Sequence, residues 1–159
     1  MKKSIRMYDM VFPLWALFTA PLILFPPILL ISLGLNFLID SLVLYIAAKI
    51  LKLDNKFFVW RKSILKIWLL GFLSDIFGGE LIFVVSYIIN QYHPYFYPVT
   101  FPAVTLIALP GVILAGLLIY LFGRKTYFSK TNLSDEQIKK LSLALAIFTA
   151  PYIMLIPTY

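Results

Sequence analysis

The sequence predicts an all-α integral membrane protein with a single transmembrane domain, residues 1–159, folded as a compact bundle of five transmembrane helices, with four helices as the alternative. Hydrophobic residues make up 62% of the chain and charged residues only 13%, whereas a soluble domain carries roughly 25% charged residues. The apolar residues also form runs long enough to cross a bilayer. Finally, the basic residues are confined to three groups at the ends of these runs.

Five apolar segments are predicted to span the membrane, at about residues 10–25, 28–51, 64–90, 102–122 and 141–157. The first ends at Pro26 and Pro27, because the second proline lacks an amide hydrogen and restricts the residue before it. As a helix, this first segment reaches only about 24 Å, less than the roughly 30 Å of the hydrocarbon core. The first segment is therefore the reason for the four-span alternative.

The third and fourth segments contain helix-weakening residues near their middles. These are Gly78 and Gly79 in the third segment, and Pro110 and Gly111 in the fourth. Glycine costs backbone entropy in a helix, and proline removes a backbone hydrogen bond. We therefore expect both helices to be interrupted near mid-membrane.

A helix start is predicted just before the fifth segment. Ser134 is an expected N-cap, with Gln137 at the third helical position of a capping box. Within the segment, residues 146–151 (AIFTAP) resemble residues 16–21 of the first segment (ALFTAP). Two interpretations stay open: a duplicated half, or two spans kinked at similar prolines that free backbone carbonyls near the outer face.

The distribution of cations predicts the orientation. All 14 basic residues lie before the first segment, between the second and third, or between the fourth and fifth. Lysine and arginine accumulate in cytoplasmic loops, so five crossings with a cytoplasmic N-terminus place every cation inside. We expect a bacterial plasma membrane, with anionic lipids at its cytoplasmic face as partners of the basic groups. This distribution argues against nucleic acid as the partner of the net charge of +7.

Three carboxylates lie inside apolar segments with no cation at the same depth, namely Asp40, Asp75 and Glu80. Acids at bilayer depth are costly and usually face a bundle interior, a partner or a water-filled path. Ser32, Asn36 and Asp40 are spaced by four and form one stripe along a helix. We take Asn36, Asp40, Asp75 and Glu80 as the candidate intramembrane polar site.

The two aspartates are predicted at nearly the same depth. Asp40 precedes Lys49 by nine residues and Asp75 follows Lys66 by nine, which is about 13 Å of helix in each case. Gly71 lies on the Asp75 face and would let another helix approach closely. Glu80 would join the pair only through a break at the glycines, since on an unbroken helix it points about 140° away from Asp75.

Three hypotheses explain these acids. They are protonated and hydrogen-bonded to Asn36 or Ser74, or they bind a proton or cation, or they pair with a group on a partner subunit. Two classes of function follow. The protein is a small non-enzymatic membrane component, either a homo-oligomer or a subunit of a membrane complex, or it is a proton- or cation-coupled transporter or channel component that uses Asp40, Asp75 and Glu80.

Recognisable catalytic and metal-binding motifs are absent from the sequence. There is no cysteine, and the one histidine, His93, lies in a loop before a proline. No zinc-protease helix, phosphate-binding glycine loop or serine-nucleophile motif occurs. We therefore expect no enzyme activity, no cofactor and no metal site.

Overall fold

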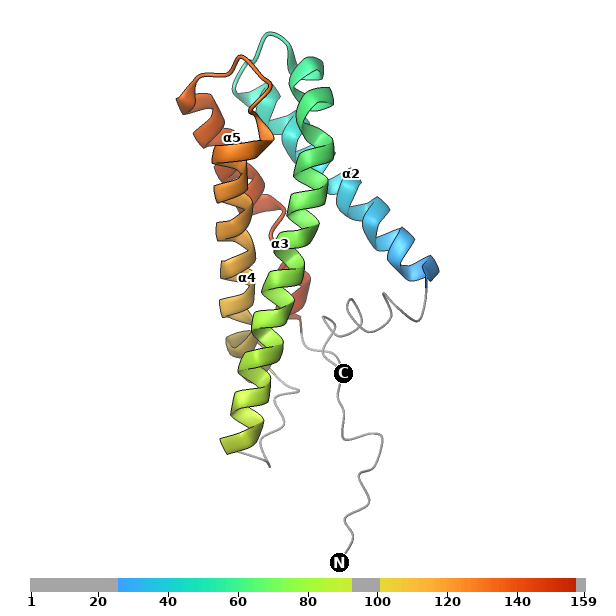
Figure 1. Cartoon of the computed structure of the whole chain (residues 1–159), viewed down its shortest axis with the longest axis vertical. Coiled ribbons are helices and arrows are strands. Elements are labelled where there is room, and N and C mark those ends of the chain that lie inside the picture. Colours follow the sequence, from blue (N-terminus) through green and yellow to red (C-terminus); the bar gives the residue numbers. More distant parts are fainter. Residues whose placement is uncertain (1–25, 93–100, 157–159) are drawn as a thin grey trace, which may run out of the picture.

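The computed structural model describes residues 26–92 and 101–156, which are almost entirely helical and contain no strand. Four main helices follow one another along the chain (Figure 1): α2 (Pro26–Ile50), α3 (Lys56–Tyr92), α4 (Ala103–Phe122) and α5 (Asp135–Phe148). A π-helical turn, η2 (Gly123–Tyr127), extends α4, and a 3-10 turn, η3 (Tyr152–Leu155), follows α5. The predicted first span at 10–25 and its resemblance to 146–151 involve residues outside these ranges, as does His93.

Four stretches of the described chain are long and apolar enough to cross a membrane, namely Leu30–Ile50, Lys56–Tyr92, Ala103–Tyr127 and Asp135–Leu155. Their outward faces expose many large apolar side chains, such as Leu30, Leu106 and Leu117. Soluble proteins rarely expose contiguous apolar surface on this scale, whereas lipid tails accommodate it. The fold therefore indicates a membrane location.

The helices run alternately up and down (Figure 1), and α3 with α4 forms the longest contact. The helix α2 packs against α3 and α5, and its N-terminal end points away from α3 (Figure 1). Where α2 and α3 meet, Trp68 Nε1 donates a hydrogen bond to the Leu33 carbonyl oxygen at 2.9 Å, and its ring packs edge-on against Phe37. This crossing brings the middle of α2 against α3.

The expected interruptions of the third and fourth helices are wrong. α3 continues through Gly78 and Gly79, and α4 continues through Pro110 and Gly111. The glycines instead let the two backbones approach: a methyl group on Gly78 would lie 2.7 Å from the Gly111 carbonyl oxygen, and one on Gly111 would collide with the Gly78 oxygen. Small residues at membrane helix contacts serve this close packing, and transmembrane helices tolerate proline.

The helix that does break is the fifth. α5 ends at Phe148, because Pro151 has no amide hydrogen to donate to the carbonyl of Ile147, four residues earlier. The Tyr152 hydroxyl takes the place of that amide and donates to the Ile147 oxygen at 2.7 Å. The kink expected at Pro151 is therefore present.

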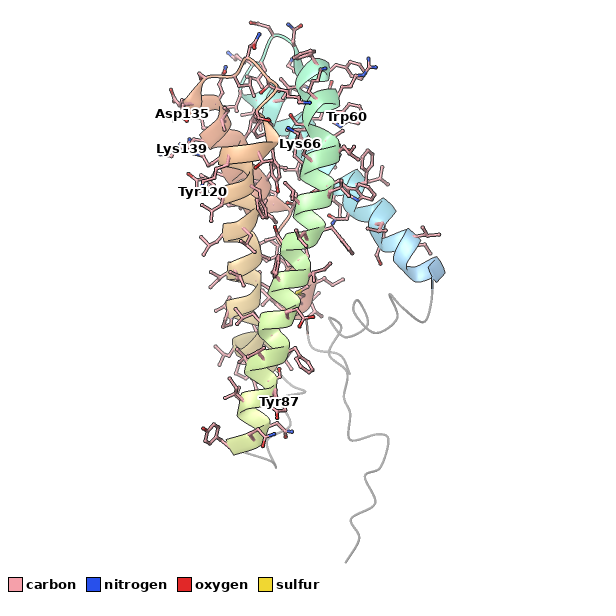
Figure 2. All side chains as sticks on the ribbon, in the orientation of Figure 1. Trp60, Lys66, Tyr87, Tyr120, Asp135 and Lys139 are labelled. Atoms are coloured by element: carbon pink, nitrogen blue, oxygen red, sulfur yellow. The ribbon has the colours of Figure 1, made fainter. Side chains whose placement is uncertain are left out.

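The basic residues of the described chain gather at one end of the bundle. Figure 2 shows Trp60, Lys66, Asp135 and Lys139 toward this end and Tyr87 toward the other. Lys66 Nζ donates to the Thr126 carbonyl oxygen at 3.1 Å and to Ser129 Oγ at 2.7 Å, joining α3 to the connection between α4 and α5.

At the same end, the predicted capping box begins α5. The Gln137 amide donates to Ser134 Oγ at 3.3 Å, and the Ser134 amide donates to Gln137 Oε1 at 3.0 Å. These two bonds satisfy backbone donors that a helix start otherwise leaves free. The capping-box prediction is confirmed.

Candidate functional site

Asp40 lies in the α2–α3 contact. Its side chain belongs to a residue only 1% exposed, and it packs over Gly71, where an added methyl group would lie 3.6 Å from Asp40 Oδ2. A methyl group there would make ordinary van der Waals contact with the carboxyl group. Asp40 Oδ2 is buried and has no hydrogen-bond partner among the described residues.

Asp75 lies one helical turn after Gly71 on α3. The residue is half-buried, and its Oδ1 atom is buried without a hydrogen-bond partner in the part of the chain described. The structure brings Asp75 within electrostatic range of Asp40. The two aspartates that the sequence predicts at matched depth are thus electrostatic neighbours in the structure.

Neither aspartate has a basic partner within residues 26–92 and 101–156. The ion pairs found there join Arg124 to Asp135 and Lys140 to Glu136, both at exposed positions. Two neighbouring carboxylates without a cation repel each other, and burial disfavours the charged form of each. The pair therefore favours a state that holds a proton or a bound cation.

Thr149, the residue after α5, lies beside Asp40, within range of an interaction with its carboxyl group. The Thr149 hydroxyl also donates to the Leu145 carbonyl oxygen at 2.8 Å. A hydroxyl has a single hydrogen but two acceptor lone pairs. A bond from this hydroxyl to Asp40 therefore competes with the bond to Leu145.

Tyr127 is a further polar group at the site, supplied by the turn η2. It is fully buried, its hydroxyl has no partner among the described residues, and it lies within electrostatic range of both aspartates. Sequence reasoning missed it because Tyr127 follows Arg124 and Lys125, a pattern typical of an interfacial aromatic. No signal in the sequence distinguishes it.

The remaining candidate residues have different surroundings. Asn36 lies one turn before Asp40 and shares a cavity with Asp75. The Ser74 hydroxyl donates to the Leu70 carbonyl oxygen at 2.7 Å, and Thr149 is a further polar neighbour of Asp40. Glu80 is exposed, and the expectation that it swings toward Asp75 is wrong because α3 is unbroken.

A cavity of about 320 Å³ lies beside the acid pair. Its walls come from the diverging part of α2, from α3, and from the chain that follows α5, as the arrangement in Figure 1 allows. The polar groups on its walls include Ser32, Asn36, Asp75 and Thr149. Asp75 thus links the buried Asp40 to an accessible volume.

Metal chemistry finds little support in this donor set. No group of three or more histidine, cysteine, aspartate or glutamate side chains suited to a metal occurs in the described ranges. What the site offers is two carboxyl groups, hydroxyl groups and an amide. Such groups hold and exchange protons, or bind a single positive charge.

Comparisons of the chain with protein-family models, with curated proteins and with solved structures find no match. The site geometry is therefore the basis for a functional assignment.

Proposed function

We propose that this protein is a non-enzymatic, multi-pass membrane protein that exchanges protons at the Asp40–Asp75 pair, as a proton-coupled transporter or a component of one. One observation carries the proposal: both aspartates have buried carboxyl oxygens without partners, and the described residues place no cation beside them. Each ionised acid at the bilayer centre costs roughly 3 kcal/mol on insertion scales. A bound proton removes one charge and the repulsion between the two.

The two aspartates have different roles in this proposal. Asp75 lines the cavity and exchanges its proton with the cavity contents. Asp40 is enclosed and does not line the cavity, so its proton exchanges through Asp75. Tyr127 is a third titratable group within range of both.

The basic end of the bundle supports the orientation that we propose. If this end is cytoplasmic, as the positive-inside rule requires, the cavity near the start of α2 and the end of α5 faces the outer leaflet of a plasma membrane. The lysines and arginines then contact anionic lipid headgroups.

A second candidate is a structural membrane component in which the acids specify helix packing or a partner subunit. The close fit of Asp40 against Gly71 favours it. In this case the Asp40 carboxyl is a joint between α2 and α3, and its replacement by asparagine changes assembly rather than transport.

Proton flux into liposomes distinguishes the two candidates. The full-length chain is reconstituted with an internal pH indicator, and flux is recorded under pH, sodium and potassium gradients. Wild type and Glu80→Gln should conduct equally, because Glu80 is exposed and away from the pair. Asp40→Asn and Asp75→Asn should each abolish the protein-dependent flux.

Wild-type flux no greater than that of protein-free liposomes under every gradient would contradict proton exchange. Altered oligomer stability in Asp40→Asn, without any flux in the wild type, would establish the structural role instead.

A further inference from the structure

The cavity beside Asp75 has the size and surface of a small-molecule site. Its volume of about 320 Å³ lies at the lower end of the roughly 300–1,000 Å³ typical of ligand pockets. Most of its wall is apolar, including Leu35, Ile39 and Ile153. An occupant therefore needs a compact apolar body.

The charged side of the cavity is a carboxyl group. Asp75 is the one acidic or basic side chain among the described residues that line it, and its Oδ1 atom is buried and unpartnered. A carboxylate in an apolar wall is unfavourable unless a positive charge or a proton compensates it. The cavity thus selects for a cation.

Aromatic rings complete the cavity wall. Phe72, Phe148 and Tyr152 all line it, and the Tyr152 hydroxyl is already engaged with Ile147. Aromatic faces attract ammonium groups, and the combination of aromatic rings with a negative charge is the usual chemistry of quaternary ammonium recognition. Inorganic cations, by contrast, prefer several oxygen ligands.

We propose that this cavity binds a lipophilic organic cation, an amine or quaternary ammonium with an apolar body, and that Asp75 is its counter-ion. The inference rests on the proposed proton exchange, since the cation replaces the proton on Asp75. Binding releases that proton, and protonation of Asp75 releases the cation. The same carboxyl group therefore couples the two fluxes.

The pH dependence follows from the groups that face Asp75. These are Asp40 from α2, Tyr127 from η2 and Tyr152 from η3. Phenols stay neutral near pH 7, and Asp40 is fully buried and does not line the cavity. Loss of the Asp75 proton then controls binding, so affinity rises as the pH rises.

Benzyltrimethylammonium is a suitable probe, because its charge is independent of pH. The full-length chain is placed in lipid nanodiscs, and binding is measured by equilibrium dialysis against neopentylbenzene, the neutral isostere. Wild type and Glu80→Gln should bind the cation, with affinity that increases with pH, while any binding of the isostere is independent of pH. Asp75→Asn should bind the cation more than about tenfold more weakly.

Proton release provides a readout that needs no variant. Addition of the cation to wild-type protein in weak buffer should release protons, and the isostere should release none. Equal binding by Asp75→Asn and wild type, or binding without proton release, would overturn the inference. So would absence of binding by the wild type, as expected if residues 10–25 or a second copy fill the cavity.

Different experimental results would contradict the proposed function and the organic-cation site. Acid-dependent proton flux without binding of the cation would leave the proposed function standing and remove the organic-cation site. Binding and proton release without flux would leave the site and contradict transport.

Discussion

The Asp40 carboxyl group depends on very few neighbours. Gly71 packs against it, and Thr149 lies beside it. Asp40 is enclosed, whereas its neighbour Asp75 lines the cavity. At the scale of single residues, the site therefore joins a buried carboxyl group to one that meets the cavity.

The depth of the acids was predictable from the sequence, but their partners were not. Counting residues from Lys49 and Lys66 was enough to pair Asp40 with Asp75, since a helix has a fixed rise. Tyr127 and Thr149 reach the pair through the packing of η2 and the end of α5, which no local pattern specifies.

Close packing of α3 on α4 at glycines makes a testable prediction. Gly111→Ala should lower the free energy of unfolding by about 1–3 kcal/mol, the usual cost of overpacking, because its methyl group collides with the Gly78 oxygen and the Ile82 side chain. Thermal unfolding in detergent measures the change.

Gly34→Ala is the matched control, since an added methyl group at Gly34 meets no atom within 4 Å in the described structure. Equal unfolding temperatures for Gly111→Ala and wild type would show that the close approach is not needed.

At the scale of elements, the sequence identified the glycines and prolines at which a helix is weakened, but it did not predict which helix would break. The glycines of α3 and the Pro110 of α4 weaken an isolated helix, yet each helix continues because the neighbouring helix packs against it. Pro151 breaks α5 because it has no amide hydrogen for the Ile147 oxygen, and the Tyr152 hydroxyl supplies a donor in its place. Local propensity alone does not distinguish these cases, because the outcome depends on tertiary contacts.

The break at Pro151 is expected to matter for the site more than for stability. Pro151→Ala restores an amide donor for the Ile147 oxygen and lets α5 continue, which moves Thr149 and the cavity wall. We expect proton flux to fall severalfold while the unfolding temperature stays the same or rises, since proline costs about 3 kcal/mol in a helix interior relative to alanine. Flux and unfolding are measured on the same preparation.

Pro110→Ala serves as control, because α4 is continuous through Pro110. Unchanged flux in Pro151→Ala would show that the end of α5 does not position the site.

At the scale of the whole molecule, the basic residues and the unpaired carboxyl groups occupy different places. The basic residues of the described chain lie at one end, the lipid-facing surfaces are apolar, and the unpaired carboxyl groups lie between helices. The all-helical class and four of the membrane-capable stretches follow from composition and apolar runs. The first span, at residues 10–25, and the orientation stay predictions.

The most direct test of the account is the infrared spectrum of the reconstituted full-length protein at neutral pH, which separates the carbonyl band of a protonated carboxyl group from the bands of carboxylates. The account predicts a protonated-carboxyl band in wild type and in Glu80→Gln, and its loss in Asp40→Asn. A wild-type spectrum with carboxylate bands alone, or a protonated band that persists unchanged in Asp40→Asn, would contradict it.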